Sequence, residues 1–303
     1  MEERCMARPF VKWAGGKGNL LKQLEALLPV NFDNQRNVTY IEPFVGGGAM
    51  LFHMLKTHKN IVKAVINDIN IDLIHCYRLI AQNPHELIKR LSVIENNFYH
   101  YDIHDRKELF YAYRDQYNSD GINSDERAAL LIFLNHTCFN GLYRVNTKGK
   151  FNVPYGRYKR PIICNEKLIM EDHRVLNSVK LTIREPGDYS LVRLNLSRKN
   201  QNFVYFDPPY RPISDTAYFR EYSNSPFGDV QQVELKRFCD RLGQLGCQIM
   251  LSNSDSKNDD GSSFFEELYE GYDFQIIYAS RCINAFPEKR TKQSEVVIRN
   301  YCL

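Results

Sequence analysis

The stretch "VTYIEPFVGGGAM", residues 38–50, joins an apolar run to a cluster of glycines and then to the start of a helical pattern. A strand that ends in a glycine turn and continues into a helix is the repeating unit of open α/β sheets, which bind ligands at that turn. Gly46 and Gly48 would let a ligand come close to the backbone. The stretch therefore predicts an α/β fold with a ligand site at the carboxyl end of the strand over 38–45.

Six more apolar runs, rich in β-branched and aromatic residues, belong to the same pattern. They cover residues 61–68, 179–185, 202–207, 247–253, 274–280 and 295–301. Helical spacing is found over 49–56, 229–245 and 264–269. Near-continuous apolar strands that alternate with helices indicate a largely parallel sheet with both faces covered. We therefore expect seven strands in one mainly parallel sheet.

Residues 71–164 interrupt this alternation. They contain helical patterns such as "PHELIKRLSVIENNF" and "DERAALLIFLNH" but no convincing strand. The economical interpretation is an insertion between the second and third strands. We predict a mostly helical domain, 71–164, inserted into a domain made of residues 1–70 and 165–303.

The end of this insertion, residues 141–160, has the sharpest compositional bias in the chain. Its sequence, "GLYRVNTKGKFNVPYGRYKR", holds six basic residues and no acid, interleaved with four aromatic rings. Cations that neutralise phosphates, beside rings and amides that meet bases, suit a nucleic-acid surface. Charge alone fits equally well a solvated loop whose rings pack inward.

Composition excludes several classes of protein. The chain of 303 residues has a net charge of +4, and its 43% of hydrophobic and 25% of charged residues are ordinary for a soluble protein. Eight cysteines without a C-x-x-C pair argue against a zinc site and a disulfide framework. Apolar runs are too short to span a membrane and the N-terminus lacks the apolar core of a signal peptide, so we expect a cytoplasmic protein.

Two motifs fail the tests for triphosphate and metal binding. "KWAGGKGNLL", residues 12–21, lacks the G-x-x-x-x-G-K-[ST] spacing, and no strand precedes it. His100 and His104 lie one helical turn apart, but no H-E-x-x-H motif accompanies them. We therefore expect neither a P-loop nucleotide triphosphatase nor a metal site.

Asp68 ends the second apolar run, at the position in the sequence where an acid can bind the ribose of a cofactor. It comes about twenty residues after Gly48, where an acid accepts hydrogen bonds from ribose hydroxyls. Leu51 stands where a dinucleotide-binding turn has its third glycine, which disfavours NAD and FAD. A tight strand-to-helix turn would explain the glycines alone, whereas the glycines and Asp68 together predict a nucleoside-containing cofactor.

The stretch "YFDPPY", residues 205–210, places an acid, two prolines and a ring directly after an apolar run. The exocyclic amine of a nucleobase is a poor nucleophile, so a catalyst must hold its N–H groups with acceptors. Asp207 offers a carboxylate, and the Pro208 carbonyl offers a second acceptor that the prolines preorganise. The Tyr210 ring offers a face on which an extruded base can stack. An ordinary proline turn is the alternative, but it requires neither the acid nor the ring.

The segments "FVKWAGGK", "EPFVGGG", "NDIN", "FNGLYRVNTKGKFNVPYGRYKRP", "PGDY", "DPPY" and "LSNSD" extend over nearly the whole chain. In this set and order the sequence resembles the Dam-like N6-adenine DNA methyltransferases, the D12 class or α group. The resemblance implies a Rossmann-like, seven-stranded class I methyltransferase sheet whose inserted helical domain recognises the DNA target. It also implies S-adenosyl-L-methionine as the cofactor, double-stranded DNA as the partner, and methyl transfer to a flipped adenine.

The resemblance also implies roles for individual residues. Those implied in cofactor binding are Trp13, Lys17, Glu42, Phe44, Gly46, Gly48, Asp68, Asp188, Tyr189 and Asp207. Those implied in catalysis are Asp207, Pro208 and Tyr210. Those implied in DNA binding are Lys12, Phe139, Asn140, Leu142, Arg144, Pro154 and Tyr158, and their match to GATC-methylating members implies the adenine of GATC as the target. Arg144 suits this role, because a bidentate contact with guanine gives about 1–3 kcal/mol of discrimination.

Two alternative functions share parts of this pattern. An N4-cytosine, RNA or protein amino methyltransferase would keep the cofactor site, whereas a non-catalytic DNA-binding module would keep the basic residues without Asp68 and Asp207. The sequence also leaves open whether a cognate restriction endonuclease acts separately beside this protein.

The sequence departs from the family pattern in the segment "RCINAFPEKRTKQSEVV". Phe286 and Pro287 stand here in a loop that contains glycine in many relatives. The resemblance therefore does not define the place of Arg290 near DNA.

Overall fold

The computed structural model describes residues 5–191, 201–211, 227–258, 261–279 and 293–303. It contains a seven-stranded sheet in the order β3-β2-β1-β4-β5-β7-β6. From β3 to β5 in this order the strands are parallel, and β7 runs antiparallel to both β5 and β6. The seven predicted strands and the mainly parallel sheet are therefore confirmed. Their bounds are Val38–Glu42 (β1), Ile61–Ile66 (β2), Lys180–Ile183 (β3), Asn202–Phe206 (β4), Cys247–Ser254 (β5), Asp273–Ala279 (β6) and Gln293–Arg299 (β7).

The central strands are buried on both faces, which explains their continuous apolar sequence. All residues of β1 and β4 are buried. Successive side chains point to opposite faces, so Tyr40 belongs to one hydrophobic cluster and Ile41 to the other. Helices cover both faces, as predicted. The first cluster includes α2 (Ala49–Thr57), α3 (Ile71–Gln82) and α7 (Glu166–Leu176), and the second includes α9 (Asp229–Gln244) and α10 (Phe264–Leu268).

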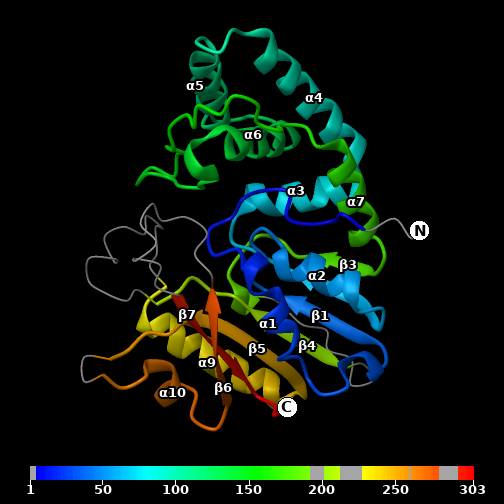
Figure 1. Ribbon diagram of the computed structural model, residues 1–303, viewed down its shortest axis with the longest axis vertical. Coiled ribbons are helices and arrows are strands. Elements are labelled where there is room, and N and C mark those ends of the chain that lie inside the picture. Colours follow the sequence, from blue (N-terminus) through cyan, green and yellow to red (C-terminus); the bar gives the residue numbers. More distant parts are fainter. Residues whose placement is uncertain (1–4, 192–200, 212–226, 259–260, 280–292) are drawn as a thin grey trace.

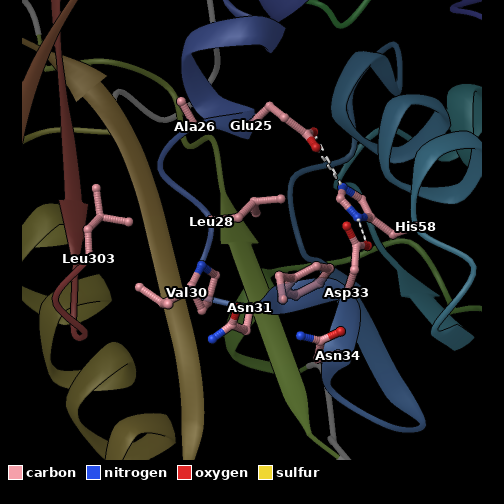
Figure 2. Close-up of a pocket in the computed structure, with 11 residues that line it drawn as sticks. Glu25, Ala26, Leu28, Val30, Asn31, Asp33, Asn34, His58 and Leu303 are labelled. Carbon is pink, nitrogen blue, oxygen red and sulfur yellow. Dashed lines mark hydrogen bonds and ion pairs between the residues drawn. The ribbon is translucent and has the colours of Figure 1, made fainter.

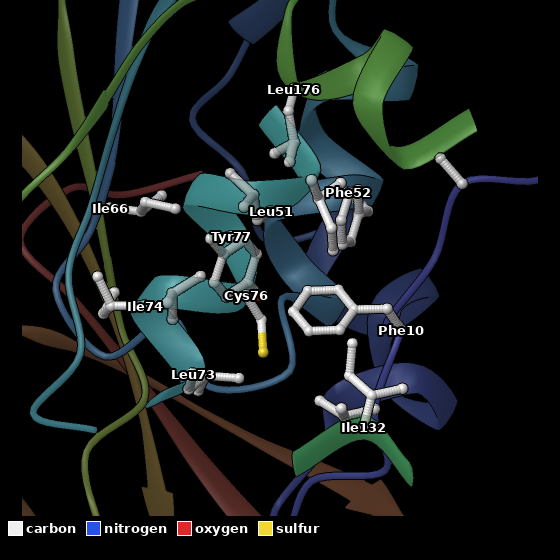
Figure 3. Close-up of a cluster of buried hydrophobic side chains, with 14 of the residues drawn as sticks. Phe10, Leu51, Phe52, Ile66, Leu73, Ile74, Cys76, Tyr77, Ile132 and Leu176 are labelled. Atoms are coloured by element: carbon white, nitrogen blue, oxygen red, sulfur yellow. The ribbon is translucent and has the colours of Figure 1, made fainter. Parts of the chain in front are cut away.

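The inserted stretch is mostly helical, as predicted. Its helices α4 (Pro84–His100), α5 (Arg106–Tyr117) and α6 (Ser124–Thr137) lie beyond α3 and α7, on the side away from the strands (Figure 1). The first hydrophobic cluster continues into these helices, and Figure 3 shows Phe10, Tyr77 and Ile132 packed together within it. The domain boundaries at residues 71 and 164 stay a prediction.

The described residues include seven cysteines, and all seven are unpaired, whereas Cys282 lies outside them. Within the same part of the chain, no group of three or more His, Cys, Asp or Glu side chains is arranged to hold a metal ion. None of the helices described is both long enough and apolar enough to cross a membrane.

The parallel strands end at one edge of the sheet, and this edge brings distant segments together. Because β2, β1 and β4 are neighbours, the turns that follow Ile66, Glu42 and Phe206 meet there. The antiparallel strand β7 contributes its amino end to the same edge, where Glu295 pairs with Ser254 at the end of β5. The edge therefore collects the glycine turn, "NDIN" and "DPPY" in one place.

Candidate active site

The turn after β1 favours glycine at two positions. Gly46 and Gly48 have φ angles of +48° and +78°, a region that glycine adopts without steric cost. A Cβ atom on Gly48 would lie 2.3 Å from the hydroxyl oxygen of Tyr77, and one on Gly46 would lie 3.0 Å from the ring of Trp13. The Tyr77 hydroxyl also donates to the Gly46 carbonyl at 3.0 Å. The turn is therefore supported by α3 and covered by Trp13.

Asp68 joins this glycine turn to the end of β2. Its Oδ2 atom accepts a hydrogen bond from the Gly46 amide at 3.0 Å, and its Oδ1 atom accepts one from the Asn70 amide at 2.9 Å. Burial raises the pKa of Asp68, and these two hydrogen bonds oppose the shift. A carboxylate can accept about four hydrogen bonds, so Asp68 keeps capacity for ligand hydroxyls beside the glycine turn.

Asn67 is a residue of this edge that the sequence reasoning does not identify. It is 2% exposed, and its Nδ2 atom donates to the Pro43 carbonyl at 3.1 Å and to the Gly187 carbonyl at 2.9 Å. The Gly187 amide donates to the Asp68 carbonyl at 3.1 Å. One buried amide thus holds the ends of β1 and β2 against the "PGDY" turn. Its only signal in the sequence is its place beside Asp68 at the end of a strand.

The "PGDY" turn presents a buried ring and an exposed carboxylate. Tyr189, which begins η4 (Tyr189–Leu191), is buried, and its ring centroid lies 5.1 Å from that of Phe44. Asp188 is exposed, and its Oδ1 atom accepts hydrogen bonds from the Ser190 amide at 2.9 Å and from the Ser190 hydroxyl. The structure therefore brings Phe44, Tyr189 and Asp188 to the edge that holds Asp68.

Lys17 links the N-terminal segment to the turn after β4. It begins η1 (Lys17–Asn19) and is 3% exposed. Its Nζ atom lies 2.7 Å from Oδ1 of Asp207 and donates to the Gly15 carbonyl at 2.9 Å. The same ammonium lies 4.7 Å from the centroid of the Tyr210 ring. Three predicted site residues, Lys17, Asp207 and Tyr210, are therefore neighbours.

Glu295 completes this group, which we call the Asp207 cluster: Lys17, Asp207, Tyr210 and Glu295. The Tyr210 hydroxyl donates to Oε2 of Glu295 at 2.6 Å, and this oxygen lies 3.8 Å from Nζ of Lys17. Glu295 follows Tyr210 by 85 residues and begins an apolar run, so no local pattern could identify it. It reaches the site because β7 is antiparallel.

Burial perturbs two carboxyl groups at this edge of the sheet. Burial raises the pKa of Asp207, the Lys17 ammonium opposes this shift, and Glu295 adds to it. Burial also raises the pKa of Glu42, although the Tyr40 hydroxyl donates to its Oε2 atom at 2.7 Å. Asp207 contributes a further increase to Glu42. Three acids, Asp207, Glu295 and Glu42, thus lie at this edge beside the Lys17 ammonium.

The "LSNSD" segment anchors the turn that carries Asp207. Asn253, at the end of β5, accepts a hydrogen bond from the Arg211 amide at 3.3 Å, and the Ser254 hydroxyl donates to the Arg211 carbonyl at 3.1 Å. Gln232, which is fully buried in α9, donates to the Pro209 carbonyl at 3.3 Å. Pro208 is buried and Pro209 is exposed. The turn is therefore held on both sides of Tyr210.

The basic segment, residues 139–160, contains most of the predicted DNA-binding residues. It is tied to the N-terminal segment by the buried Asn135, whose Oδ1 atom accepts from the Lys12 amide at 2.8 Å and whose Nδ2 atom donates to the carbonyls of Lys12 and Gly141. The Lys12 ammonium lies 5.2 Å from the centroid of the Tyr158 ring. The Tyr158 hydroxyl accepts from the Asn140 amide at 3.1 Å. Asn135 is another residue that the sequence reasoning misses.

Two apolar side chains of this segment point to solvent. Phe139, in η3 (Phe139–Gly141), is 51% exposed, and Leu142 is 41% exposed. The Phe139 amide donates to the Pro154 carbonyl at 2.8 Å, which fixes the backbone at this ring. The structure thus gathers Lys12, Phe139, Asn140, Leu142, Pro154 and Tyr158 on one surface.

Arg144 is exposed but held in place. Its Nε atom donates to Oδ1 of Asn152 at 2.7 Å, and its Nη2 atom donates to the Asn152 carbonyl at 3.4 Å. The neighbouring residue, Tyr143, stacks on Trp13 with ring centroids 5.1 Å apart and an interplanar angle of 24°. The basic segment therefore touches the residue that covers the glycine turn.

Comparison with known proteins identifies the family. A model of the D12 class N6 adenine-specific DNA methyltransferases matches residues 13–283. The chain belongs to this family. It is 42% identical to the type II methyltransferase M.MjaIII of Methanocaldococcus jannaschii over 97% of this chain and 99% of that protein. It is 31% identical to the DNA adenine methylase of Haemophilus influenzae over 98% of this chain and 95% of that protein. Among solved structures, an rRNA methyltransferase, aviRa from Streptomyces viridochromogenes, gives a TM-score of 0.41 at 13% identity, with coverage of 96% and 90%.

The sheet of this D12 methyltransferase is the class I methyltransferase sheet that the sequence implies, with β7 inserted antiparallel between β5 and β6. Its predicted site residues lie in two places, the edge around Asp207 and the surface of the basic segment. Their roles in binding cofactor and DNA stay predictions. The loop with Phe286, Pro287 and Arg290 lies outside the described residues.

A cavity of the D12 methyltransferase, about 530 Å³ in volume, is lined by none of the predicted site residues, and Figure 2 shows the residues that line it. It is lined by residues 25, 26 and 28–34, together with His58 and Leu303. His58 precedes β2 and Leu303 follows β7, so the cavity lies at the edge of the sheet opposite Asp207. It therefore takes no part in the predicted site.

Proposed function

We propose that this protein transfers a methyl group from S-adenosyl-L-methionine to N6 of an adenine that is flipped out of duplex DNA, within GATC. The observation that carries the proposal is the contact of Lys17, Asp207 and Tyr210 at the edge of the sheet that also holds the glycine turn. Family membership supplies the reaction class, and the geometry supports the assignment of residues to it.

The residues of this edge fit S-adenosyl-L-methionine. Gly46 and Gly48 give the ligand access to the backbone, and Asp68 keeps acceptor capacity for ribose hydroxyls. Trp13 covers the turn, and Lys17 can receive a carboxylate. When bound, the cofactor would supply an electrophilic methyl group, which N6 of the target base would attack in line. The bond between methyl carbon and sulfur would break as the new N–C bond forms, S-adenosyl-L-homocysteine would leave, and N6 would lose one proton. The carboxyl groups of Asp207, Glu295 and Glu42, which lie at this edge beside the Lys17 ammonium, would attract the sulfonium cation.

The same edge fits the amino group of the target base. The Asp207 carboxylate accepts one N–H group, and the Pro208 carbonyl, preorganised by its ring, accepts the second. The Tyr210 ring offers the face on which the extruded base stacks. Lys17 opposes the increase that burial causes in the pKa of Asp207, because its ammonium lies 2.7 Å from the carboxylate. Direct displacement requires no nucleophile from the protein.

The basic segment fits a sequence-specific contact with DNA. Arg144 carries a guanidinium that Asn152 orients, which suits bidentate binding to guanine. The Phe139 ring is exposed and would fill the position that the flipped adenine leaves, and the Lys12 ammonium lies on the same surface. We infer GATC as the site from these residues together.

The test is to sequence DNA after incubation with the purified protein and S-adenosyl-L-methionine, with a readout for both N6-methyladenine and N4-methylcytosine. The expected result is N6-methyladenine at GATC, and the Asp207→Ala variant serves as the control without transfer. Parallel reactions with RNA and protein acceptors should stay unlabelled. Methylation at another site, or of cytosine, would contradict the assignment of the target.

A further inference from the structure

Glu295 is a buried acid at the amino end of an apolar strand. It is 8% exposed, and the three residues that follow it, Val296, Val297 and Ile298, are 3% exposed or less. Burial of a carboxylate is unfavourable unless the group is hydrogen-bonded or paired. The partners of Glu295 therefore indicate what it does in this position.

Those partners are two residues of the proposed catalytic site. Tyr210 donates its hydroxyl hydrogen to Oε2 of Glu295 at 2.6 Å, and the Lys17 ammonium lies 3.8 Å from the same oxygen. Burial raises the pKa of Tyr210, and the charges of Asp207 and Glu295 raise it further, so the phenol stays protonated and donates. A hydrogen bond to a carboxylate is stronger than one between neutral groups.

The Tyr210 ring is consequently fixed at both ends. Asn253 and Ser254 hold the backbone of the next residue, Arg211, and Glu295 holds the hydroxyl at the far end of the ring. The Lys17 ammonium lies over one face of the ring, 4.7 Å from its centroid. With the ammonium on one face, the proposed stacking of a flipped base would use the opposite face.

We propose that Glu295 is a positioning residue for methyl transfer. By accepting from Tyr210 and sharing Lys17 with Asp207, it holds the stacking ring and the acceptor carboxylate in a fixed arrangement before DNA arrives. The inference rests on the proposed function, and it adds a residue from β7 that lies outside the motifs of the sequence.

The test is a double-mutant cycle on the single-turnover rate of methylation of a GATC duplex. Tyr210→Phe removes the hydroxyl and keeps the ring, and Glu295→Leu removes the acceptor. Each should lower the rate about tenfold to a hundredfold, the range expected for one hydrogen bond to a charged group. The double variant should be no slower than the slower single variant, because both remove the same interaction. Rates that multiply in the double variant would overturn the proposal.

Two further measurements, rescue by a conservative variant and fluorescence of the target base, distinguish a positioning role of Glu295 from a role in stability alone. Glu295→Gln keeps an acceptor and should retain the parental rate within about fivefold. With 2-aminopurine in place of the target adenine, Glu295→Leu should increase emission, because stacking on Tyr210 quenches this base. Unchanged emission, or a rate that falls only in proportion to the unfolded fraction in circular dichroism, would contradict positioning. If Glu295→Leu does not fold, the Tyr210→Phe and Glu295→Gln rates decide: the first must fall and the second must not.

The matched control is Ser294→Ala. Ser294 is the neighbouring residue of β7, so its side chain points to the opposite face of the strand from that of Glu295, and its hydroxyl donates to Oδ2 of Asp255 at 3.1 Å. This variant should keep the parental rate. A parental protein that methylates no DNA would contradict the proposed function, whereas an active parent with independent Tyr210 and Glu295 effects would contradict this inference alone.

Discussion

The Asp207 cluster and the basic segment hold their polar groups in different ways. In the cluster, an ammonium and two carboxylates from η1, the turn after β4 and β7 meet in a buried place. In the basic segment, an exposed guanidinium rests on the neutral side chain of Asn152. Buried charges fix distances but are costly to leave unpaired, whereas exposed neutral contacts contribute little to stability. Substitutions in the cluster should therefore slow transfer at every site, and substitutions in the basic segment should change which site is chosen.

The largest expected effect comes from Asp207→Ala. This variant removes an acceptor from the target amine and leaves the Lys17 ammonium without its nearest carboxylate. The single-turnover rate should fall by about a thousandfold, as for the loss of one preorganised polar contact to the reacting group. Binding of a GATC duplex, measured by fluorescence anisotropy, should stay close to the parental value, because the basic segment is unchanged.

Asp207→Asn is the control for this variant. It keeps the size of the side chain and one acceptor, so thermal melting should match that of the parent while the rate stays low. A parental rate in Asp207→Ala, or a loss of DNA binding as large as the loss of rate, would remove the distinction between the two regions.

The next effect concerns the choice of sequence. The parent should prefer a GATC duplex to a duplex in which the guanine is replaced by another base. Arg144→Ala should reduce this preference by about 1–3 kcal/mol, measured as the ratio of the kcat/KM values for the two duplexes. Asn152→Ala should reduce it less, about threefold to tenfold, because the guanidinium remains but is no longer oriented.

Lys148→Ala provides the comparison for these two variants. Lys148 is an exposed cation of the same segment, and its loss should weaken binding to all duplexes alike and decrease the salt dependence of affinity. If Arg144→Ala slowed GATC and the altered site equally, Arg144 would serve affinity rather than choice of sequence.

The sequence predicts the frame of this molecule well because the relevant patterns are local. Apolar runs such as 202–207 become β4, and residues that follow strand ends, such as Asp68 and Asp207, meet because parallel strands end at one edge. Periodicity also predicts the helical nature of residues 71–164.

The residues that the sequence does not reveal act across long separations. Glu295 belongs to an antiparallel strand, and only the register with Ser254 places it beside Tyr210. Asn67 and Asn135 are single amides that bond to the backbone of other segments, and Asn152 bonds to Arg144 within the basic segment. Nothing in the neighbouring sequence distinguishes these asparagines, because their importance depends on hydrogen-bond partners that no local pattern specifies.

A third effect is the pH dependence of transfer. Burial raises the pKa of Asp207, with Lys17 opposing and Glu295 adding. Transfer needs the ionised carboxylate, so kcat/KM should fall on acidification about tenfold per pH unit below a midpoint that lies above the ordinary aspartate pKa of about 4. Glu295→Gln should move this midpoint to lower pH, because it removes a negative charge that favours the protonated form. Arg144→Ala should keep the parental midpoint, and a midpoint that rises in Glu295→Gln would contradict the assignment.

The smallest effect lies where the two regions touch. Trp13 is the single tryptophan of the chain, and it covers Gly46 while stacking on Tyr143 of the basic segment. Its emission should change when S-adenosyl-L-methionine is titrated into the protein. Tyr143→Leu should weaken cofactor binding about twofold to tenfold, the range expected for one aromatic stack.

Tyr143→Phe keeps the ring and should bind the cofactor as the parent does, which separates stacking from the loss of the hydroxyl. A Tyr143→Leu variant with parental affinity and parental emission would mean that the stack between Trp13 and Tyr143, a contact between the basic segment and the cover of the glycine turn, does not couple the two regions. Weaker cofactor binding in Tyr143→Leu, but not in Tyr143→Phe, would instead show that the basic segment supports Trp13 over the glycine turn. The transfer rate and the choice of DNA site would then be independent only to within the free energy of this stack.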